Sequence, residues 1–300
     1  MPASGCIDCH AHHYSAEVLA DPLDWGKANH EHLWLACVAP TDRPSLQDWV
    51  RTDQLLAAMD ADGIERTVLQ SWYWEQAATV RAQNDFLSDC LRSHSDRLSA
   101  FAALPFAEGT AAVLAEAQRA LKAGFNGFGE LHPGVNALHE QPATWDALAE
   151  FAAKAQVPLL VHVTEPVGAR YPGRVETPLD LLLNHTCAHP ETTYILAHLG
   201  GLLPIFALNR RLAASFENLY FDLAAAPLLY EPRICRTMVD CVGAERLLFG
   251  TDYPLRVAPS KRTHADFATT HAWLHRAGLD ATTLIAITQD NARRLLHLPE

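Results

Sequence analysis

The stretch Gly-Cys-Ile-Asp-Cys-His-Ala-His at residues 5–12 is the first apolar run of the chain, and it ends in two histidines separated by one alanine. Alternate side chains of a β-strand lie on the same face, so the run predicts a strand that presents Asp8, His10 and His12 together. Two imidazoles at this spacing are suited to hold a metal ion. The stretch therefore predicts an element of the fold and part of a site.

Seven further short apolar runs follow, and stretches with helical periodicity separate them. The eight predicted strands lie near residues 5–10, 65–71, 98–104, 125–131, 157–163, 193–198, 218–223 and 246–251. They are apolar on both faces, as parallel strands covered by helices must be. A βα unit repeated eight times predicts a (β/α)8 TIM barrel. The structural alternative is a doubly wound sheet, but that fold would place a glycine-rich phosphate turn after the first strand, and the sequence has none there.

No shift in composition divides the 300 residues, so we expect a single domain over residues 1–300. The connection over residues 13–50 is long for a βα loop, which predicts a lid or substrate loop. Residues 280–300 are expected to form a C-terminal helical tail. Hydrophobic residues at 49% and charged residues at 19% are typical of a globular protein with a substantial core.

The charge balance excludes several classes of partner. With 23 basic and 35 acidic residues the formal net charge is −12, so we expect neither nucleic acid nor a membrane surface as partner.

The N-terminus lacks a signal pattern and no window is apolar enough for a membrane span, so the expected compartment is the cytoplasm. Seven cysteines, an odd number, argue against a disulfide framework. The expected partner is a small-molecule substrate, and the sequence leaves homo-oligomerisation open.

Polar residues close four of the later predicted strands: Glu130 the fourth, His162 the fifth, His198 the sixth and Asp252 the eighth. In a TIM barrel these ends form the active-site face. On each of these strands the residue two positions earlier is predicted to share the inward face of the polar residue. These four residues are Phe128, Leu160, Leu196 and Gly250. A lone buried histidine is more often a hydrogen-bonded core residue, but six candidate ligands at strand ends favour a site. Four imidazoles and two carboxylates could hold two divalent ions.

Other residues near these strand ends receive different interpretations. His13, His132 and His139 are expected to be solvated on loops, and Cys9 to be a packing residue. Trp72 and Trp74, which follow the second strand, are candidate substrate contacts, although packing is the commoner role of tryptophan. Two arginines on the loop after the fifth strand, Arg170 and Arg174, could clamp a substrate carboxylate, and a solvated or structural role is equally open.

Taken together, these motifs resemble the amidohydrolase superfamily, in its amidohydrolase-related branch of TIM-barrel metal-dependent hydrolases. The resemblance rests on Ile-Asp-Cys-His-Ala-His at 7–12, Glu130, His162, His198, Thr251-Asp252 and Asp-Asn-Ala-Arg-Arg-Leu-Leu at 290–296. It implies that His10, His12 and Asp252 bind one metal and that His162 and His198 bind another. It also implies that Glu130 bridges the two, with no carbamylated lysine.

We therefore expect a metal-dependent hydrolase of a small-molecule amide, lactone or ester, with metal-activated water as the nucleophile. The catalytic residues would be Asp252, which the resemblance implies transfers the proton, and His198. The expected cofactor is one or two divalent ions, zinc in preference to manganese. The alternative is a metal-dependent decarboxylase of an aromatic or unsaturated carboxylic acid, which does not need a bridging Glu130. A third hypothesis is a barrel that binds a ligand without turnover.

Overall fold

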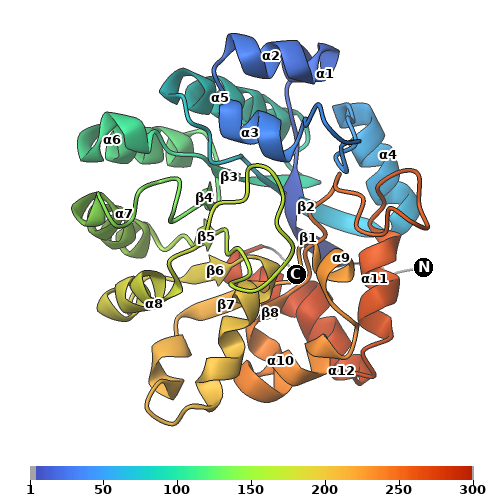
Figure 1. Ribbon diagram of the computed structural model, residues 1–300. Helices are drawn as coiled ribbons and strands as arrows, with labels where there is room; N and C mark the ends of the chain where they lie inside the picture. The colour runs from blue at the N-terminus through green and yellow to red at the C-terminus, as the bar shows by residue number, and fades with distance from the viewer. Residues whose placement is uncertain (1–4, 299–300) are drawn as a thin grey trace.

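A computed structural model describes residues 5–298, and in it eight parallel strands form one sheet in the order β1 to β8 (Figure 1). The strands are β1 (Cys6–His12), β2 (Ile64–Gln70), β3 (Leu98–Ala102), β4 (Gly127–Leu131), β5 (Leu159–Val161), β6 (Tyr194–Leu196), β7 (Leu219–Asp222) and β8 (Leu247–Leu248). Each of them coincides with a predicted run. The predicted TIM barrel is confirmed.

The barrel closes where β1 meets the segment that follows β8. The backbone N–H of Cys9 donates to the carbonyl of Phe249 at 2.8 Å, and the N–H of Asp252 donates to the carbonyl of His10, also at 2.8 Å. The buried Asp8 carboxylate reinforces this seam, because it accepts from the N–H of Thr251 at 3.0 Å and from its hydroxyl at 2.8 Å. Asp8 therefore holds the two ends of the barrel together. The expectation that Asp8 shares the inward face of His10 and His12 is wrong, because the register of β1 shifts between Asp8 and Ala11.

Helices surround the barrel, and short glycine turns return the chain to it (Figure 1). Gly63 and Gly124, at φ of 69° and 95°, supply the left-handed conformation between a helix and the next strand. The outer helices are α4 (Thr52–Asp62), α5 (Ala77–Ser93), α6 (Thr110–Lys122), α7 (Pro142–Ala155), α8 (Leu179–Ala188), α10 (Ile234–Val242) and α11 (Ala268–His275). The shorter helical elements are α1 (Ala16–Ala20), α2 (Pro22–Ala28), α3 (His32–Cys37), η1 (Phe106–Glu108), η2 (His198–Leu208), η3 (Ala213–Phe216), α9 (Ala226–Leu229), η4 (Ala244–Arg246), α12 (Ala281–Ile285), η5 (Ala286–Asp290) and α13 (Asn291–Leu295).

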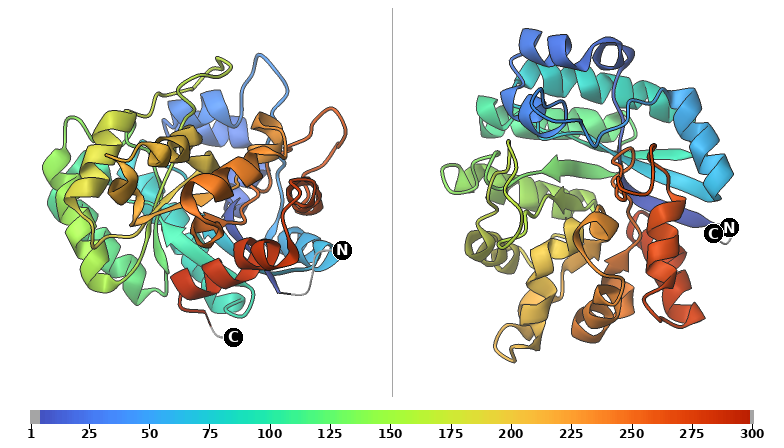
Figure 2. Two further views of the ribbon diagram at one scale, coloured as in Figure 1. Left: turned by 90° about the horizontal axis from the view of Figure 1, so that it is seen from below. Right: turned by 45° about the vertical axis from the view of Figure 1, so that its right-hand side comes forward.

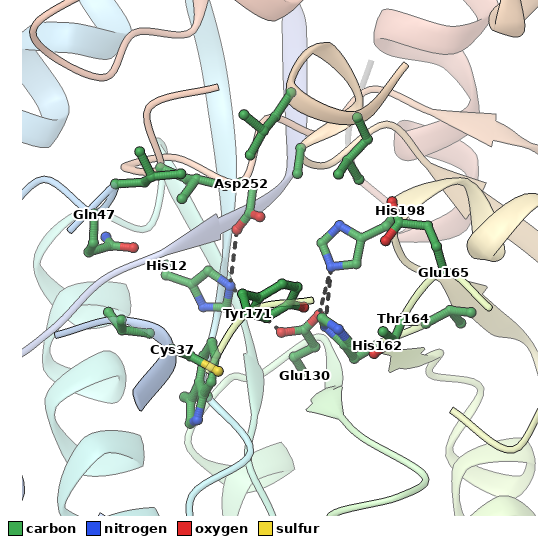
Figure 3. A pocket seen from close by; sticks show the side chains of 18 of the residues that line it. His12, Cys37, Gln47, Glu130, His162, Thr164, Glu165, Tyr171, His198 and Asp252 are labelled. Atoms are coloured by element: carbon green, nitrogen blue, oxygen red, sulfur yellow. Dashed lines mark hydrogen bonds and ion pairs between the residues drawn. The ribbon is translucent and has the colours of Figure 1, made fainter. Parts of the chain in front are cut away.

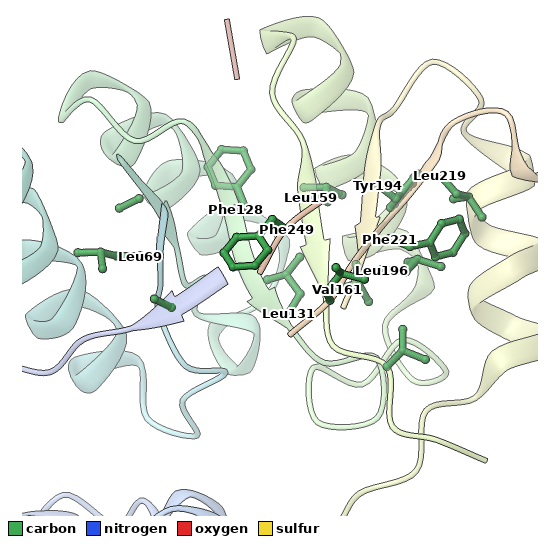
Figure 4. Close-up of a cluster of buried hydrophobic side chains, with 14 of the residues drawn as sticks. Leu69, Phe128, Leu131, Leu159, Val161, Tyr194, Leu196, Leu219, Phe221 and Phe249 are labelled. Atoms are coloured by element: carbon green, nitrogen blue, oxygen red, sulfur yellow. The ribbon is translucent and has the colours of Figure 1, made fainter. Parts of the chain in front are cut away.

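The core has two layers. The larger layer lies between strands and helices, and Figure 4 shows part of it, including Phe128, Tyr194 and Phe221. The smaller layer fills the barrel and is made by the alternate strand residues, among them Ile7, Cys9, Val68, Phe101, Leu160, Ile195 and Leu248. Ala292 and Leu296 of the C-terminal segment pack on this inner layer. The segment thus closes the end of the barrel at which β1 begins (Figure 2). No helix within the described residues is long and apolar enough to cross a bilayer.

The predicted side-chain alternation is correct on two strands and wrong on two. Leu160 belongs to the inner layer, and a Cβ at Gly250 would contact the side chains of His10 and Asp222. Phe128, in contrast, packs outward against Phe151 of α7. A register irregularity between Phe128 and Leu131 then turns Glu130 inward.

On β6, the outward residue is Leu196. His198 reaches the site because the strand ends and the chain takes a left-handed conformation, with φ of 58° at this residue. The alternation of side chains along a strand, from which the inward face was predicted, does not predict such a turn.

The connection over residues 13–50 contains α1, α2 and α3 and packs an aromatic cluster beside the barrel mouth. Tyr14, Trp25 and Trp34 of this connection pack against Trp74, with ring centroids 5.6–6.2 Å away. Trp49 extends the cluster through Tyr14 and Trp34, at 5.8 and 5.9 Å. The connection is therefore folded against the barrel by its own rings. The lid role of this connection stays a prediction, and so does the organisation of residues 1–300 as a single domain.

We predict that Thr251→Val lowers the free energy of unfolding of the metal-free protein by about 1–3 kcal/mol. Valine preserves the shape but leaves one buried oxygen of Asp8 without its donor, and it removes the acceptor of the Tyr253 N–H. Urea denaturation measures the change. Thr282→Val, at an exposed position of α12, is the matched control and should stay within about 0.5 kcal/mol of wild type. Equal stability of the two variants would remove Asp8 from its seam role.

Candidate metal centre

Six predicted ligands converge at the C-terminal ends of the strands. They form two groups, His10 with His12 and Asp252, and Glu130 with His162 and His198, and the donor atoms of each group lie within 4.8 Å of one another. Figure 3 shows Asp252 directed toward His12, and Glu130 directed toward His162 and His198. Side chains from β1, β4 and the segments after β5, β6 and β8 thus meet at one point, as the sequence predicts.

In the first group the two imidazoles of β1 face one carboxylate oxygen. His10 Nε2 and His12 Nε2 are 3.4 Å apart, and Asp252 Oδ1 lies 4.0 Å from the former and 3.3 Å from the latter. Ligands at about 2.0–2.1 Å from a tetrahedral ion would be about 3.3 Å apart. The observed separations therefore suit a shared cation.

Glu130 lies between the two groups. Its Oε1 is 2.8 Å from His162 Nδ1, 3.5 Å from His198 Nε2 and 3.8 Å from His10 Nε2. Its Oε2 is 3.7 Å from His12 Nε2. One buried carboxylate thus contacts or approaches all four imidazoles, which is the position that either a bridging ligand or an orienting carboxylate would take.

Two of the imidazoles are oriented by groups outside the cluster. His198 Nδ1 donates to the carbonyl of Ala224 at 3.0 Å, so in the neutral ring its Nε2 offers a lone pair to the cluster. His10 Nδ1 lies 2.8 Å from Asp222 Oδ2, which fixes that ring in the same way. Asp222 Oδ1 also accepts from the backbone N–H of His198 at 2.9 Å. Such outer partners typically set the orientation of metal-binding histidines.

Sequence reasoning missed Asp222, although a signal was available. It is the last polar residue of the predicted strand 218–223, in the run Tyr-Phe-Asp, and the strand β7 ends at it. It is fully buried and lies between two of the predicted ligands in space. Only the strand-end rule, applied to β7 as well, could have found it.

The electrostatics of the cluster favour positive charge. Burial alone would lower the pKa of His10, yet Asp222 raises it to about 9. Burial opposes the charge of His198 as well, but the bond to Glu130 raises its pKa to about 10. Burial would raise the pKa of Glu130, but His162 holds it well below the usual range. Carboxylates that stay ionised beside imidazoles with raised pKa values mark a place where a cation is stabilised.

The backbone around the cluster departs from common conformations. Asp252 has φ of 67° and Ala225, in the cavity wall, has φ of 55°. The chain is left-handed over residues 198–202, a run that includes Gly200 and Gly201. A Cβ at Gly200 would come within 2.9 Å of the ring of Phe221, so this turn needs glycine. Left-handed non-glycine residues gathered at one place are typical of functional sites.

The donor set fits a divalent metal ion. The lone pairs on His10 and His198 point at other acceptors, which is unfavourable unless protons or a cation lie between them. His12 adds a buried Nδ1 that has no partner among the described residues. Imidazole nitrogens with carboxylate oxygens suit zinc, manganese or iron. The residues that would hold the ion are the six of the cluster.

A cavity of about 270 Å³ opens above the cluster. Its floor contains His12, Glu130, His162, His198 and Asp252. Its walls are mainly apolar and come from several loops, with Val38, Leu46, Trp72, Tyr73, Val163, Leu228, Leu229 and Leu255 among the lining residues. Trp72 and Tyr73 stack on each other with centroids 4.1 Å apart. The site is therefore a small apolar slot above a polar floor.

The predicted substrate contacts are placed differently from one another. Trp72 lines the cavity, as expected, but Trp74 is buried in the aromatic cluster and donates to Ser71. Arg170 is exposed and outside the cavity lining. Arg174 donates to the carbonyl of Glu165 at 2.6 Å, a structural role. The clamp expected from these two arginines is therefore wrong.

Arg43, from the long first connection, is the arginine that lines the cavity. Its Nη2 lies 3.5 Å from the carbonyl of Ala36, and its Nε is buried without a partner among the described residues. No sequence pattern favours Arg43 over the other arginines, because the position of residue 43 depends on how the whole connection folds.

The expectation that His13 and His132 are solvated is also wrong. His13 is buried, and its Nε2 lies 3.0 Å from the Thr52 hydroxyl. His132 stacks on His162 at 4.9 Å, and burial lowers its pKa to about 3, so the ring is neutral. His132 thus supports a member of the cluster. His139 is exposed, as predicted.

Comparison with known proteins establishes the family. The sequence profile of the family described as Amidohydrolase matches residues 7–298, so the chain belongs to the amidohydrolase family. Gamma-resorcylate decarboxylases from Rhizobium radiobacter and from Rhizobium sp. (strain MTP-10005) are each 25% identical over 299 residues, covering 82% of this chain and 87% of theirs.

Solved structures share the fold. A 2,6-dihydroxybenzoate decarboxylase from Rhizobium superposes with a TM-score of 0.70 at 22% identity, covering 99% of each chain. A dihydroxybenzoic acid decarboxylase from Polaromonas sp. JS666 with bound manganese gives 0.69 at 19%, covering 99% of this chain and 98% of that one. A 5-carboxyvanillate decarboxylase from Sphingomonas paucimobilis gives 0.72 at 14%, covering 99% and 100%.

These findings correct the expected reaction. The relatives and the structural neighbours named above are decarboxylases of aromatic acids, so the hydrolase interpretation, with an amide, lactone or ester as substrate, is wrong. The preference for zinc loses its support too, because decarboxylases among the structural neighbours are recorded with manganese. The error has a physical reason: the same imidazoles and carboxylates serve either reaction, and Glu130 does not separate them.

We predict that Asp222→Asn weakens binding of Mn²⁺ by about 10- to 100-fold, because the amide cannot hold His10 as the charged acceptor does. Titration of metal-free protein with Mn²⁺, followed by electron paramagnetic resonance, measures the affinity. Asp240→Asn on the exposed face of α10 is the control and should bind as wild type does. Unchanged affinity in a folded Asp222→Asn protein would show that Asp222 does not orient the ligands.

Proposed function

We propose that the protein is a divalent-metal-dependent decarboxylase of an aromatic carboxylic acid. The observation that carries the proposal is the combination in one cavity of a metal-binding floor, apolar and aromatic walls, and a single arginine, Arg43. The names of the relatives point to the same class of substrate. Manganese, which neighbours of this fold contain, is the ion we propose.

The size and the walls of the cavity suit one aromatic ring. Sites for drug-sized ligands have volumes of roughly 300–1,000 Å³, and this one has about 270 Å³. A planar ring would have Trp72, Tyr73, Leu228 and Leu229 among the side chains that line its cavity. Its polar substituents would then reach the floor.

Each polar group has a distinct task in this proposal. A bound divalent ion would supply positive charge that holds the anionic oxygens of the acid against the floor. Arg43 pairs with a second oxygen, because its guanidinium is the cationic side chain in the cavity wall. His198 acts as a ligand rather than a proton carrier, since its Nδ1 is committed to Ala224.

Asp252 moves the proton. Its carboxylate lies between His12 and the open cavity, with 13% of the side chain exposed. Asp252 gives a proton to the ring carbon that bears the carboxylate, the bond between these carbons breaks, its electron pair returns to the ring, and CO₂ leaves. Water at the cavity mouth then restores the proton. Burial alone would raise the pKa of Asp252, but His12 and the other imidazoles lower it, so the resting carboxylate is ionised and takes its proton from water at the cavity mouth before it passes that proton to the ring carbon.

The test is CO₂ release by Mn²⁺-loaded protein from a panel of hydroxybenzoic acids, with the methyl ester of each acid as the matched negative substrate. We expect turnover of at least one free acid and of no ester, because only the free carboxylate can leave as CO₂. We predict that Asp252→Asn lowers kcat by about 100-fold or more while still binding the acid. A panel without CO₂ release, or Asp252→Asn at wild-type kcat, would contradict the proposal.

We predict that Arg43→Met raises KM for the aromatic acid by about tenfold or more, because a hydrogen bond to a charged group contributes roughly 1.5–3 kcal/mol. Methionine retains the apolar stem, so the walls stay filled. Steady-state kinetics of the two proteins measures the effect. Arg170→Met, at the exposed arginine outside the cavity, is the control and should leave KM unchanged. Equal effects of the two substitutions would mean that Arg43 does not bind the carboxylate.

A further inference from the structure

A second group of potential ligands lies outside the barrel, between α7 and α8. It consists of Asp146 on α7, His185 on α8 and His189 at the end of α8, with donor atoms within 4.8 Å of one another. None of the three lines the cavity above the barrel. We propose that these residues bind a divalent transition-metal ion, zinc by preference, which links the two helices.

One oxygen of Asp146 is shared by both imidazoles. Asp146 Oδ1 lies 2.9 Å from His189 Nε2 and 3.3 Å from His185 Nδ1. Two imidazole nitrogens and a carboxylate oxygen at such separations are three of the four ligands of a tetrahedral zinc site. Asp146 is half exposed, so water can complete the set.

His185 is held rigidly in the position that a ligand needs. Its ring is buried, with edge contacts to Trp145 and Tyr194 at 5.8 and 5.9 Å. Its Nε2 lies 3.2 Å from the Tyr194 hydroxyl. A hydroxyl can accept the proton of Nε2 as well as donate its own, so with the proton on Nε2 the lone pair of His185 lies on Nδ1, 3.3 Å from Asp146 Oδ1.

His189 is positioned through its backbone. The side-chain amide of Asn218 donates to the carbonyls of Thr186, His189 and Thr192, each at 3.0–3.1 Å. These bonds fix the turn after α8 that carries His189 to Asp146. The two imidazoles are thus preorganised by separate networks, so little conformational entropy is lost when an ion binds.

The test counts tightly bound ions. Metal-free protein is titrated with Zn²⁺ by isothermal calorimetry and checked by equilibrium dialysis with elemental analysis. We expect His189→Gln and Asp146→Asn each to lose one equivalent of Zn²⁺ per chain relative to wild type. Asparagine keeps an acceptor for the histidines but is a poor ligand, so it separates a metal site from a hydrogen-bonded link.

The matched control is His275→Gln. Like His185 and His189, His271 and His275 are one helical turn apart, and their Nε2 atoms are 3.3 Å apart. Among the described residues, no carboxylate joins these two histidines in a group that could hold a metal ion. The control should retain the wild-type count. Zn²⁺ should also raise the Tm of wild type more than that of His189→Gln.

An equal count in wild type, His189→Gln and Asp146→Asn would overturn the proposal, and so would loss of the same equivalent in His275→Gln. The readout does not use CO₂ release, so failure of the decarboxylase proposal would leave this result unaffected.

Discussion

The buried charge of Glu130 is the constraint on which the centre of this molecule depends. Its carboxylate is 1% exposed and lies 2.8–3.8 Å from nitrogens of four imidazoles. An ionised carboxylate without compensation inside a protein is strongly unfavourable, so positive charge must accompany it. Because Asp222 and Ala224 orient two of the imidazoles, the compensation comes either from protons on those rings or from a cation that they share. The cluster is therefore arranged for a cation before any substrate is considered.

The fold could be predicted from the sequence almost completely, because its main signal is local. Each strand is a short apolar run, and glycines such as Gly63 and Gly124 end the helices that separate the runs. What failed was the direction of single side chains. Phe128 and Leu196 point outward, whereas Glu130 and His198, two residues later in each case, reach the site. The alternation breaks because β4 is irregular after Phe128 and because β6 ends just before a left-handed turn.

The site could be predicted only in part. The residues that escaped prediction owe their roles to contacts with residues far away in the sequence. The six candidate ligands lie together because they end strands, and the barrel brings all strand ends to one face. Asp222 ends a strand too, but its role depends on the distance to His10 across the barrel. Arg43 and the neutral, stacked His132 depend on how long loops fold, which no periodicity encodes.

The reaction was the part that the ligands alone could not determine. Imidazoles and carboxylates around a divalent ion can activate water or can hold an acid by its oxygens, and the donor set is the same in either case. The walls discriminate better than the floor. A slot lined by Trp72, Tyr73 and several leucines has little to offer the polar leaving group of an amide. The aromatic ring of the substrate class that we propose would fit such walls, with its carboxylate directed to the floor and to Arg43. Because loss of CO₂ from such an acid needs only a positive floor and one proton at the ring carbon, the apolar walls above the cluster, rather than the presence of Glu130 within it, carry the chemical distinction.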